Sequence, residues 1–389
     1  MDIKGVRSSI PALNGRIFLN HAAVSPMPIK AAESMKNFLN DKVRARLTYN
    51  VNLEHWMEKA RDSKRFFSRL IGATEDEIAL IPNTTFGLNL IAHMLPYKPG
   101  SNVVTNTLEY TSNVIAWLKL RELGVEVRII RDVNGRISLE GFEKNVDERT
   151  VAVAVGQVGW FNGFRHNLKA ISEFAHDRGA FLVVDGIQAV GNMKIDVVRD
   201  GIDFLACGSY KWLMGPQNAG FLYIKKDLID ELNPPFLGEN SIDPGMVKRS
   251  IYERFDLFDL KYSKGIGKYE VVHIDDVAYV GASESMHLIL DFGIERVEER
   301  IKRIDEYLVE GLLERGLELQ TPVGEGEYHA IINFKVKDAD KVMEFLSRSN
   351  IVVSKRVGGI RVSPHFYNTE EEIDIFLNIL EKASGTEML

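Results

Sequence analysis

Residues 181–188 read Phe-Leu-Val-Val-Asp-Gly-Ile-Gln, and residues 204–211 read Phe-Leu-Ala-Cys-Gly-Ser-Tyr-Lys. Each segment is an apolar run of strand length that leads into polar residues, with Asp185 in the first segment and Lys211 in the second. Continuous apolar runs are typical of strands that are buried on both faces, as in a parallel sheet. Open α/β sheets bind ligands at the carboxyl ends of their strands, so the two segments predict a site that contains Asp185 and Lys211.

The same pattern continues on both sides of these segments. Short β-branched runs alternate with amphipathic stretches, and two of the predicted helices end at Gly124 and Gly179. The predicted fold class is therefore α/β, with a large domain whose mostly parallel seven-stranded sheet is covered by helices. The predicted strands are 78–81, 102–105, 125–130, 151–155, 180–185, 203–207 and 220–224.

A second, smaller domain is predicted after residue 267. The segment 234–267 contains two adjacent prolines and several glycines, which indicates a loop that leaves the large domain. The following elements predict an α+β unit: helices at 275–292, 294–315 and 369–383, and strands near 330–336 and 360–363. The predicted division is an N-terminal arm (1–20), a large cofactor-binding domain (21–267) and a small C-terminal domain (268–389).

Composition restricts the function classes. The 389 residues are 45% hydrophobic and 26% charged, as in soluble globular proteins, and the net charge of -7 without a basic block disfavours nucleic acid as a partner. The sequence shows neither a secretory signal nor ~18 consecutive apolar residues, so we expect a cytoplasmic protein without membrane contact. Cys207 is the only cysteine and the histidine spacing does not favour a metal, so we expect no metal ion.

Asp185 and Lys211 together match the requirements of pyridoxal phosphate. A carboxylate keeps the pyridine nitrogen protonated, and a lysine amine forms an imine with the aldehyde. Taken singly, each residue has an ordinary alternative, because strand-terminal acids often cap helices and lysines after strands are often solvated. The pair is therefore more informative than either residue.

Residues 183–188 and 209–216 resemble the paired cofactor motifs of the class V aminotransferase family of pyridoxal phosphate enzymes. The likeness covers residues 17–380 through five motifs in the family order, and it is closest to the isopenicillin N epimerase-like and cysteine desulfurase-like branch. This resemblance implies fold type I, the aspartate aminotransferase-like fold. It also implies pyridoxal 5′-phosphate attached to Lys211, with Asp185 at the ring nitrogen.

The resemblance further implies the contacts of the cofactor. Thr84 and Thr85 correspond to the threonine pair that cradles the phosphate, and Tyr110 corresponds to the aromatic residue that stacks on the ring. Gln188 corresponds to the residue that hydrogen-bonds the phenolic oxygen.

Further cofactor contacts follow from the same likeness. Tyr210 is similar to a kynureninase-type tyrosine that bonds the phosphate, and Ser209 of the same motif is counted with the cofactor-binding residues. His273 stands where the family takes a phosphate ligand from the neighbouring subunit, and the family likeness implies a homodimer.

The substrate contacts implied by the likeness lie near the two ends of the chain. Residues 359–369 resemble the C-terminal family signature, in which the arginine at Arg361 grips the α-carboxylate of an amino acid. Residues 18–26 resemble the N-terminal signature, which folds over the active site and places Asn20 and His21 near the substrate. The alternative for Asn20 and His21 is that they only order the arm.

Two departures from the desulfurase pattern bear on the reaction. Desulfurases of this family carry a cysteine in the loop before the substrate arginine, but residues 354–359 read Ser-Lys-Arg-Val-Gly-Gly. Cys207, at the end of an apolar run, is predicted to be a buried structural residue. Trp160 replaces an asparagine of the desulfurases, and Asn162 either contacts the ring or makes a turn with Gly163.

These features predict an enzyme that acts at the α-carbon of a small amino acid, as an aminotransferase or an isopenicillin N epimerase-like enzyme. One alternative is a cysteine or selenocysteine lyase-type β-elimination without a catalytic cysteine. The other is a catalytically retired protein that still binds the cofactor.

Overall fold

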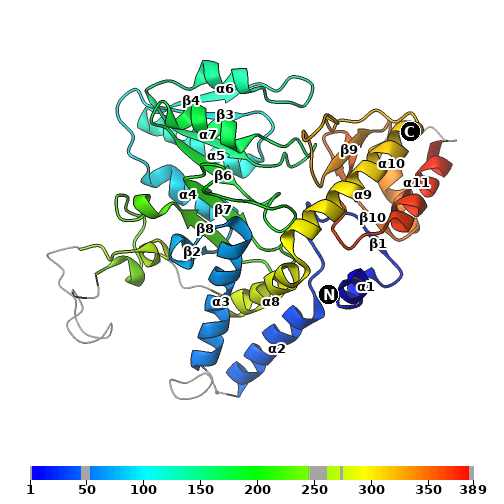
Figure 1. Cartoon of the computed structure of the whole chain (residues 1–389), viewed down its shortest axis with the longest axis horizontal. Coiled ribbons are helices and arrows are strands. Elements are labelled where there is room, and N and C mark those ends of the chain that lie inside the picture. The colour runs from blue at the N-terminus through cyan, green and yellow to red at the C-terminus, as the bar shows by residue number, and fades with distance from the viewer. Residues whose placement is uncertain (1, 45–52, 244, 246–260, 272–274, 385–389) are drawn as a thin grey trace.

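The computed structural model describes the chain except for residues 1, 45–52, 244, 246–260, 272–274 and 385–389 (Figure 1). Its centre is a seven-stranded sheet with the order β2-β8-β7-β6-β5-β3-β4. All seven strands that the sequence predicts for the large domain are present, and their ends differ from the prediction by at most one residue. The strands are β2 (Ile78–Ile81), β3 (Asn102–Asn106), β4 (Glu126–Ile130), β5 (Thr150–Gly156), β6 (Phe181–Asp185), β7 (Phe204–Gly208) and β8 (Gly220–Ile224).

The strand directions distinguish two ends of this sheet. Strands β4, β3, β5, β6 and β7 run parallel, and β8 alone runs antiparallel to its neighbours β7 and β2. The last residues of β5, β6 and β7 (Gly156, Asp185 and Gly208) therefore lie together, and we call this the carboxyl end of the sheet. The opposite end, where Asn102 and Thr150 begin their strands, is the amino end.

Helices cover both faces of the sheet, as the apolar strands require. Side chains alternate along a strand, so Val184 and Leu205 enter one apolar cluster with α3, α7 and α8, while Val183 and Ala206 enter another with α4 and α5. Burial on both faces confirms the predicted α/β class. The helices are α3 (Leu53–Ile71), α4 (Thr84–Met94), α5 (Thr111–Leu118), α6 (Leu139–Asn145), α7 (Leu168–His176) and α8 (Asp276–Phe292).

A second structural unit, with an apolar cluster of its own, forms around α9 (Ile294–Glu314) and a small sheet of order β11-β12-β9. Its strands pair antiparallel, and Leu308, Phe334 and Phe376 are among the buried residues. The N-terminal β1 (Ile17–Phe18) pairs parallel with β10, so the arm belongs to this unit. The other elements are α1 (Ile3–Ser8), α2 (Ile29–Val43), β9 (Ile332–Lys335), α10 (Ala339–Arg348), β10 (Ile351–Val352), β11 (Ser354–Arg356), β12 (Gly359–Val362) and α11 (Glu370–Ser384).

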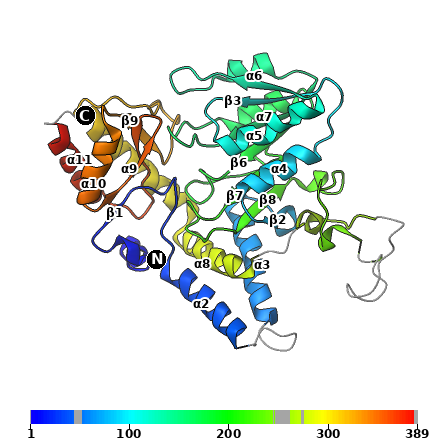
Figure 2. The ribbon, with the colours of Figure 1, turned by 180° about the vertical axis from the view of Figure 1, so that it is seen from behind.

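Helices α8 and α9 connect the two units. Figure 2 shows α8 beside α2 and α3, and its Tyr279 and Met286 join the apolar cluster of the large sheet. In α9, Ile304 and Leu308 join the cluster of the small sheet instead. The division into an arm and two domains at residues 20 and 267 stays a prediction.

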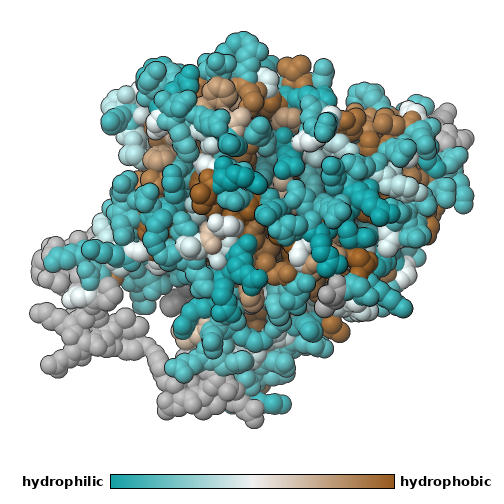
Figure 3. Space-filling model, viewed as in Figure 1, coloured by the Kyte–Doolittle hydropathy of each residue, from teal (hydrophilic) through white to brown (hydrophobic). Residues whose placement is uncertain are grey.

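One face of the molecule is mainly hydrophilic. Figure 3 shows polar residues over most of the face seen in Figure 1, with apolar patches between them. The mean hydropathy of the whole sequence is -0.11. Within the described ranges, no helix combines the length and the apolar character needed to cross a bilayer.

Candidate active site

Asp185 and Lys211 come together at the carboxyl end of the sheet. Asp185 ends β6, and Lys211 follows β7, the adjacent strand. Both side chains are buried, with 5% and 8% of each residue exposed. Burial raises the pKa of Asp185 to about 6. A hydrogen bond from the Ile187 N–H at 3.0 Å and the positive charge of Lys211 act to lower this pKa but do not outweigh burial. The carboxyl group is therefore largely ionised at neutral pH.

Burial favours the unprotonated form of the Lys211 amine. Burial lowers its pKa to about 8; Asp185 acts to raise it, and Arg361 and Arg356 act to lower it. The Nζ atom lies 5.7 Å from the centroid of the Tyr110 ring. A pKa near 8 gives Lys211 a larger unprotonated fraction at neutral pH than an ordinary lysine has, and the unprotonated amine is the nucleophile.

An unpartnered hydroxyl lies at the first turn of α4. Thr84 begins this 11-residue helix, and its buried Oγ1 has no hydrogen-bond partner among the described residues. A Cβ atom on Gly208 would lie 3.4 Å from that oxygen and 3.3 Å from Cε1 of Tyr210, so a larger residue at this position would crowd the hydroxyl. An unsatisfied hydroxyl at a helix N-terminus suits an anion such as a phosphate.

Two other hydroxyls predicted to contact the cofactor already have protein partners. The Oγ1 of Thr85 donates to Oγ of Ser112 at 2.9 Å, and the Oγ of Ser209 donates to the carbonyl of Pro216 at 2.6 Å. Either hydroxyl would have to rotate before it could donate to a phosphate. Their cofactor contacts therefore stay predictions.

The side chain of Gln188 has a fixed orientation. Its Oε1 accepts from Nε1 of Trp212 at 2.9 Å, and its Nε2 donates to the carbonyl of Ala22 at 3.1 Å. Gln188 and Asp185 line the same narrow cavity. One amide N–H of Gln188 remains, and this is the donor that a phenolic oxygen would need.

Glu109 lines the same cavity and was missed by the sequence analysis. Its carboxylate accepts hydrogen bonds from the Gly156 N–H at 2.8 Å, Asn106 Nδ2 at 2.8 Å and Asn113 Nδ2 at 2.7 Å. Burial raises its pKa to about 7, these hydrogen bonds oppose the rise, and Asp185 adds to it. Glu109 comes three residues after β3, which ends at Asn106, so the pattern that located Asp185 at the end of an apolar strand did not locate it.

Aromatic residues lie above this cavity. The ring of Tyr110, which is 45% exposed, meets Trp160 edge to face with centroids 5.5 Å apart. Asn162 makes other contacts: its Nδ2 donates to the carbonyl of Gly135 at 2.9 Å, and its Oδ1 accepts from the Phe164 N–H at 3.2 Å. These contacts support the turn alternative for Asn162.

Arg361 enters the site from β12 of the small sheet. It is 1% exposed; its Nε donates to Oγ of Ser354 at 3.2 Å, and its Nη1 donates to the carbonyl of Trp160 at 2.6 Å. Its Nη2 is buried and has no hydrogen-bond partner in the part of the chain that the structure describes. Burial, and then the charge of Arg356, lowers its pKa to about 9, so the group stays cationic at neutral pH. An oriented cation with an unsatisfied N–H group suits a carboxylate.

Asn20 and His21 lie beside the same part of the small unit. Asn20 forms a parallel bridge with Ser363, and its buried Oδ1 has no partner. His21 is fully buried, with Nδ1 2.8 Å from the carbonyl of Ser363 and Nε2 2.6 Å from Oη of Tyr367. Because both ring nitrogens are occupied, these contacts support the alternative that His21 orders the arm, whereas Asn20 keeps an acceptor. His273 lies outside the described residues, and its predicted contact stays a prediction.

Residues 17–376 match the family model described as Aminotransferase class-V. The chain belongs to the class V aminotransferase family. The members of this family are pyridoxal phosphate enzymes of fold type I, and pyridoxal 5′-phosphate is the cofactor of this protein. The Thr84 hydroxyl at the start of α4, which has no partner among the described residues, and the lack of a side chain at the adjacent Gly208 fit its phosphate.

Several relatives align with almost the whole chain. A "Probable cysteine desulfurase" of Pyrococcus abyssi is 29% identical, over 97% of this chain and 96% of the relative. An "Uncharacterized aminotransferase YcbU" of Bacillus subtilis is 27% identical, over 94% of each chain. The solved apo cysteine desulfurase from Thermococcus onnurineus NA1 has 27% identity and a TM-score of 0.90, over 99% of each chain. The structural likeness confirms the predicted fold.

Proposed function

We propose that the protein acts at the α-carbon of a small amino acid, as an aminotransferase or an isopenicillin N epimerase-like enzyme. The observation that best supports this proposal is the buried pair of Asp185 and Lys211 together with Arg361, whose Nη2 has no partner. This set provides a ring-nitrogen partner, a nucleophilic amine and a carboxylate ligand.

In this proposal, four groups hold the cofactor. Lys211 would hold it covalently through Nζ, Asp185 would partner the pyridine nitrogen, Thr84 at the start of α4 would bind the phosphate, and the remaining N–H of Gln188 would bind the phenolic oxygen. When bound, pyridoxal phosphate supplies an electron sink for the charge that develops at the α-carbon.

The chain's own residues then bind the amino acid and move a proton. Arg361 orients the amino acid through its α-carboxylate, and this orientation presents the Cα–H bond to Lys211. The freed amine of Lys211 takes that proton on Nζ. This proton removal is common to transamination and epimerisation, and the two reactions diverge only after it.

Elimination at the β-carbon is a second candidate, because several relatives are named cysteine desulfurases. A relay through a protein thiol lacks support, since Cys207 is the only cysteine, is buried, and has its thiol pKa raised by that burial. The hairpin of β11 and β12 stands where desulfurases carry their cysteine, and it closes through only Val357 and Gly358. An elimination by this chain would therefore release its sulfur or selenium product directly.

Mass spectrometry of products from a panel of amino acids tests these alternatives. We expect oxo-acid or inverted amino acid from the wild type, and neither from Lys211→Ala. Pyruvate and ammonia from cysteine or selenocysteine would support elimination instead. Cofactor binding without any product across the panel would support a retired enzyme.

A homodimer in the cytoplasm is part of the same proposal. Family active sites form at a two-fold interface, and the resemblance implies that His273 contacts the phosphate of the neighbouring subunit. Light scattering of the purified protein should give about twice the mass of one chain, which is 43.9 kDa.

A further inference from the structure

Arg356 shares a strand face with the residue that orients Arg361. In β11, Ser354 accepts the hydrogen bond of Arg361 Nε, whereas Lys355 points to the other side and pairs with Asp340 of α10 at 2.6 Å. Successive residues of a strand face opposite ways. Arg356 therefore lies on the same side as Ser354, toward the Arg361 guanidinium.

The backbone that carries Arg356 is fixed by a tight hairpin. Arg356 pairs with Gly359 across β11 and β12, and only Val357 and Gly358 connect them. Both connecting residues have positive φ, 48° and 75°, as in the two-residue turns that match the twist of paired strands. The distance between the Arg356 and Arg361 backbones is consequently set by strand pairing.

Among the described residues, the two arginines have no acidic partner. Within the described ranges, neither Arg356 nor Arg361 forms an ion pair, and Nη1 of Arg356 donates only to the carbonyl of Lys355, at 2.6 Å. The positive charge of Arg356 contributes, after burial, to the lowered pKa values of Arg361 and Lys211. A ligand with one carboxylate would neutralise only one of the two guanidinium groups.

Space for a ligand lies next to the hairpin that carries Arg356. A cavity of about 570 Å³ is lined by Val357, which follows Arg356, and by Trp160, whose carbonyl accepts a hydrogen bond from Arg361, although neither arginine is among its lining residues. Glu109 of the cofactor cavity also lines it. The volume lies in the range of small-molecule sites.

We propose that the substrate is an amino acid with a second anionic group at its distal end, such as a dicarboxylic amino acid, and that Arg356 binds this group while Arg361 binds the α-carboxylate. This inference rests on the proposed function and names its substrate class. Arg356 is then the residue that determines specificity.

Calorimetric titration of the cofactor-loaded protein tests the assignment with succinate and glutarate against butyrate. A second charge-assisted contact should give the dicarboxylates an affinity higher by on the order of 10- to 100-fold. Arg356→Gln should remove this preference and Arg356→Lys should retain part of it. Lys355→Gln, the matched control on the opposite face, should keep the wild-type preference. Equal affinities in the wild type, or an undiminished preference in Arg356→Gln, would overturn the inference.

Failure of this inference can be separated from failure of the proposed function. Borohydride reduction followed by peptide mapping reports cofactor attachment to Lys211 without any substrate. Attachment at Lys211 with no dicarboxylate preference would refute the role of Arg356 and leave the proposed function standing. A preference that depends on Arg356 without attachment at Lys211 would refute the proposed function and support the anion site.

Discussion

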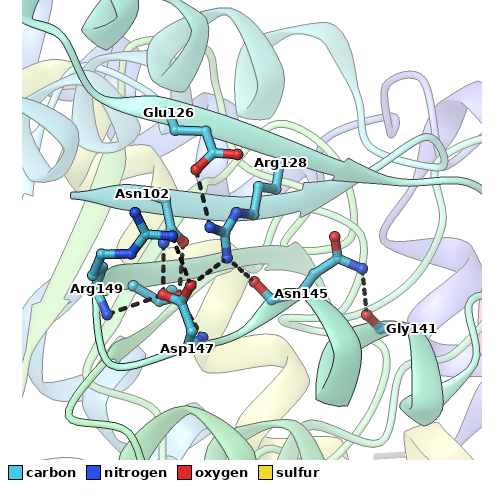
Figure 4. A network of polar contacts seen from close by, with 8 residues as sticks. Asn102, Glu126, Arg128, Gly141, Asn145, Asp147 and Arg149 are labelled. Atoms are coloured by element: carbon cyan, nitrogen blue, oxygen red, sulfur yellow. Dashed lines mark hydrogen bonds and ion pairs between the residues drawn. The ribbon is translucent and has the colours of Figure 1, made fainter. Parts of the chain in front are cut away.

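The two ends of the central sheet treat charged groups in opposite ways. At the amino end, Asp147 accepts from Asn102 Nδ2 at 2.8 Å and from Arg128 Nη1 at 2.9 Å (Figure 4). Arg149 adds a contact at 3.2 Å, and Glu126 pairs with Arg128 at 3.0 Å. Burial raises the pKa of Asp147, but these hydrogen bonds outweigh burial and hold that pKa well below its usual range.

At the carboxyl end, burial dominates and the charges lack full compensation. The pKa of Asp185 is raised and those of Lys211 and Arg361 are lowered, in each case mainly by burial. Among the described residues, Thr84 Oγ1 and Arg361 Nη2 are buried polar atoms without a partner. A charge that protein groups satisfy therefore contributes to stability, whereas a buried polar group without a partner marks a place for a ligand.

The largest expected effect comes from removing the amine at the carboxyl end. Lys211→Ala should abolish covalent cofactor attachment and slow exchange of the α-proton by about 10²- to 10⁴-fold, the usual contribution of a general base. Exchange is measured by NMR in deuterated buffer, and attachment by peptide mapping after borohydride. Lys355→Ala is the control and should behave as wild type; an adduct on a lysine other than Lys211 would refute the assignment.

Arg361→Ala should weaken amino acid binding by about 3 kcal/mol, because a charge-assisted hydrogen bond contributes ~1.5 to 3 kcal/mol. Arg361→Lys should also bind poorly, since an ammonium group cannot reproduce the planar fork. Cofactor absorbance reports the titration. Simple amines without a carboxylate should bind the wild type and both variants equally, and amino acid affinity unchanged in Arg361→Ala would contradict this role.

At the amino end of the sheet, removal of a charged group should affect stability and leave catalysis unchanged. Asp147→Asn should lower the free energy of unfolding by about 1 to 2 kcal/mol, as expected for lost hydrogen bonds to a charged group, and leave α-proton exchange unchanged. The folded-state pKa of Asp147 is depressed, so its stabilisation is present above the unfolded value of about 3.9 and is lost as pH falls through the folded-state pKa.

Urea unfolding of wild type and Asp147→Asn at several pH values checks this sign. The difference between the two proteins should be constant at neutral pH and shrink below about pH 4. A difference that instead grew as the pH fell would show that the network is not held together by the Asp147 charge.

The smallest effect is expected at Cys207. Cys207→Ala should leave turnover unchanged within about twofold and cost ~1 kcal/mol of stability, because the change removes one buried sulfur atom. Product formation from cysteine and selenocysteine should be measured beside the stability. A complete loss of sulfur release in this variant, with the fold intact, would show that the buried thiol takes part in the reaction.

The sequence predicted the large sheet well because its strands are long apolar runs with polar ends. That pattern also located Asp185 and Lys211, whose positions follow from where β6 and β7 stop. The short strands β1, β10 and β11 were missed, since two or three residues are too few to show a period.

Other features could not be predicted because they depend on contacts distant in sequence. Glu109 receives the N–H of Gly156, which is 47 residues away, and its raised pKa reflects burial that no local pattern records. Arg356 looked like an ordinary loop residue until strand pairing placed it on the face of Ser354. The two hydrogen-bond partners of the His21 ring, Ser363 and Tyr367, lie more than 300 residues after it in the sequence.

The pairing of Ile17 with Ile351 has a consequence for synthesis of the chain. β1 leaves the ribosome more than 300 residues before its partner β10. At about 5 to 20 residues per second, the first strand waits on the order of 20 s to a minute for that partner. During this interval Leu19, which is fully buried in the finished protein, has no apolar cluster to enter. Docking of the N-terminal arm is therefore a late step, and chains that stop before residue 351 cannot complete it.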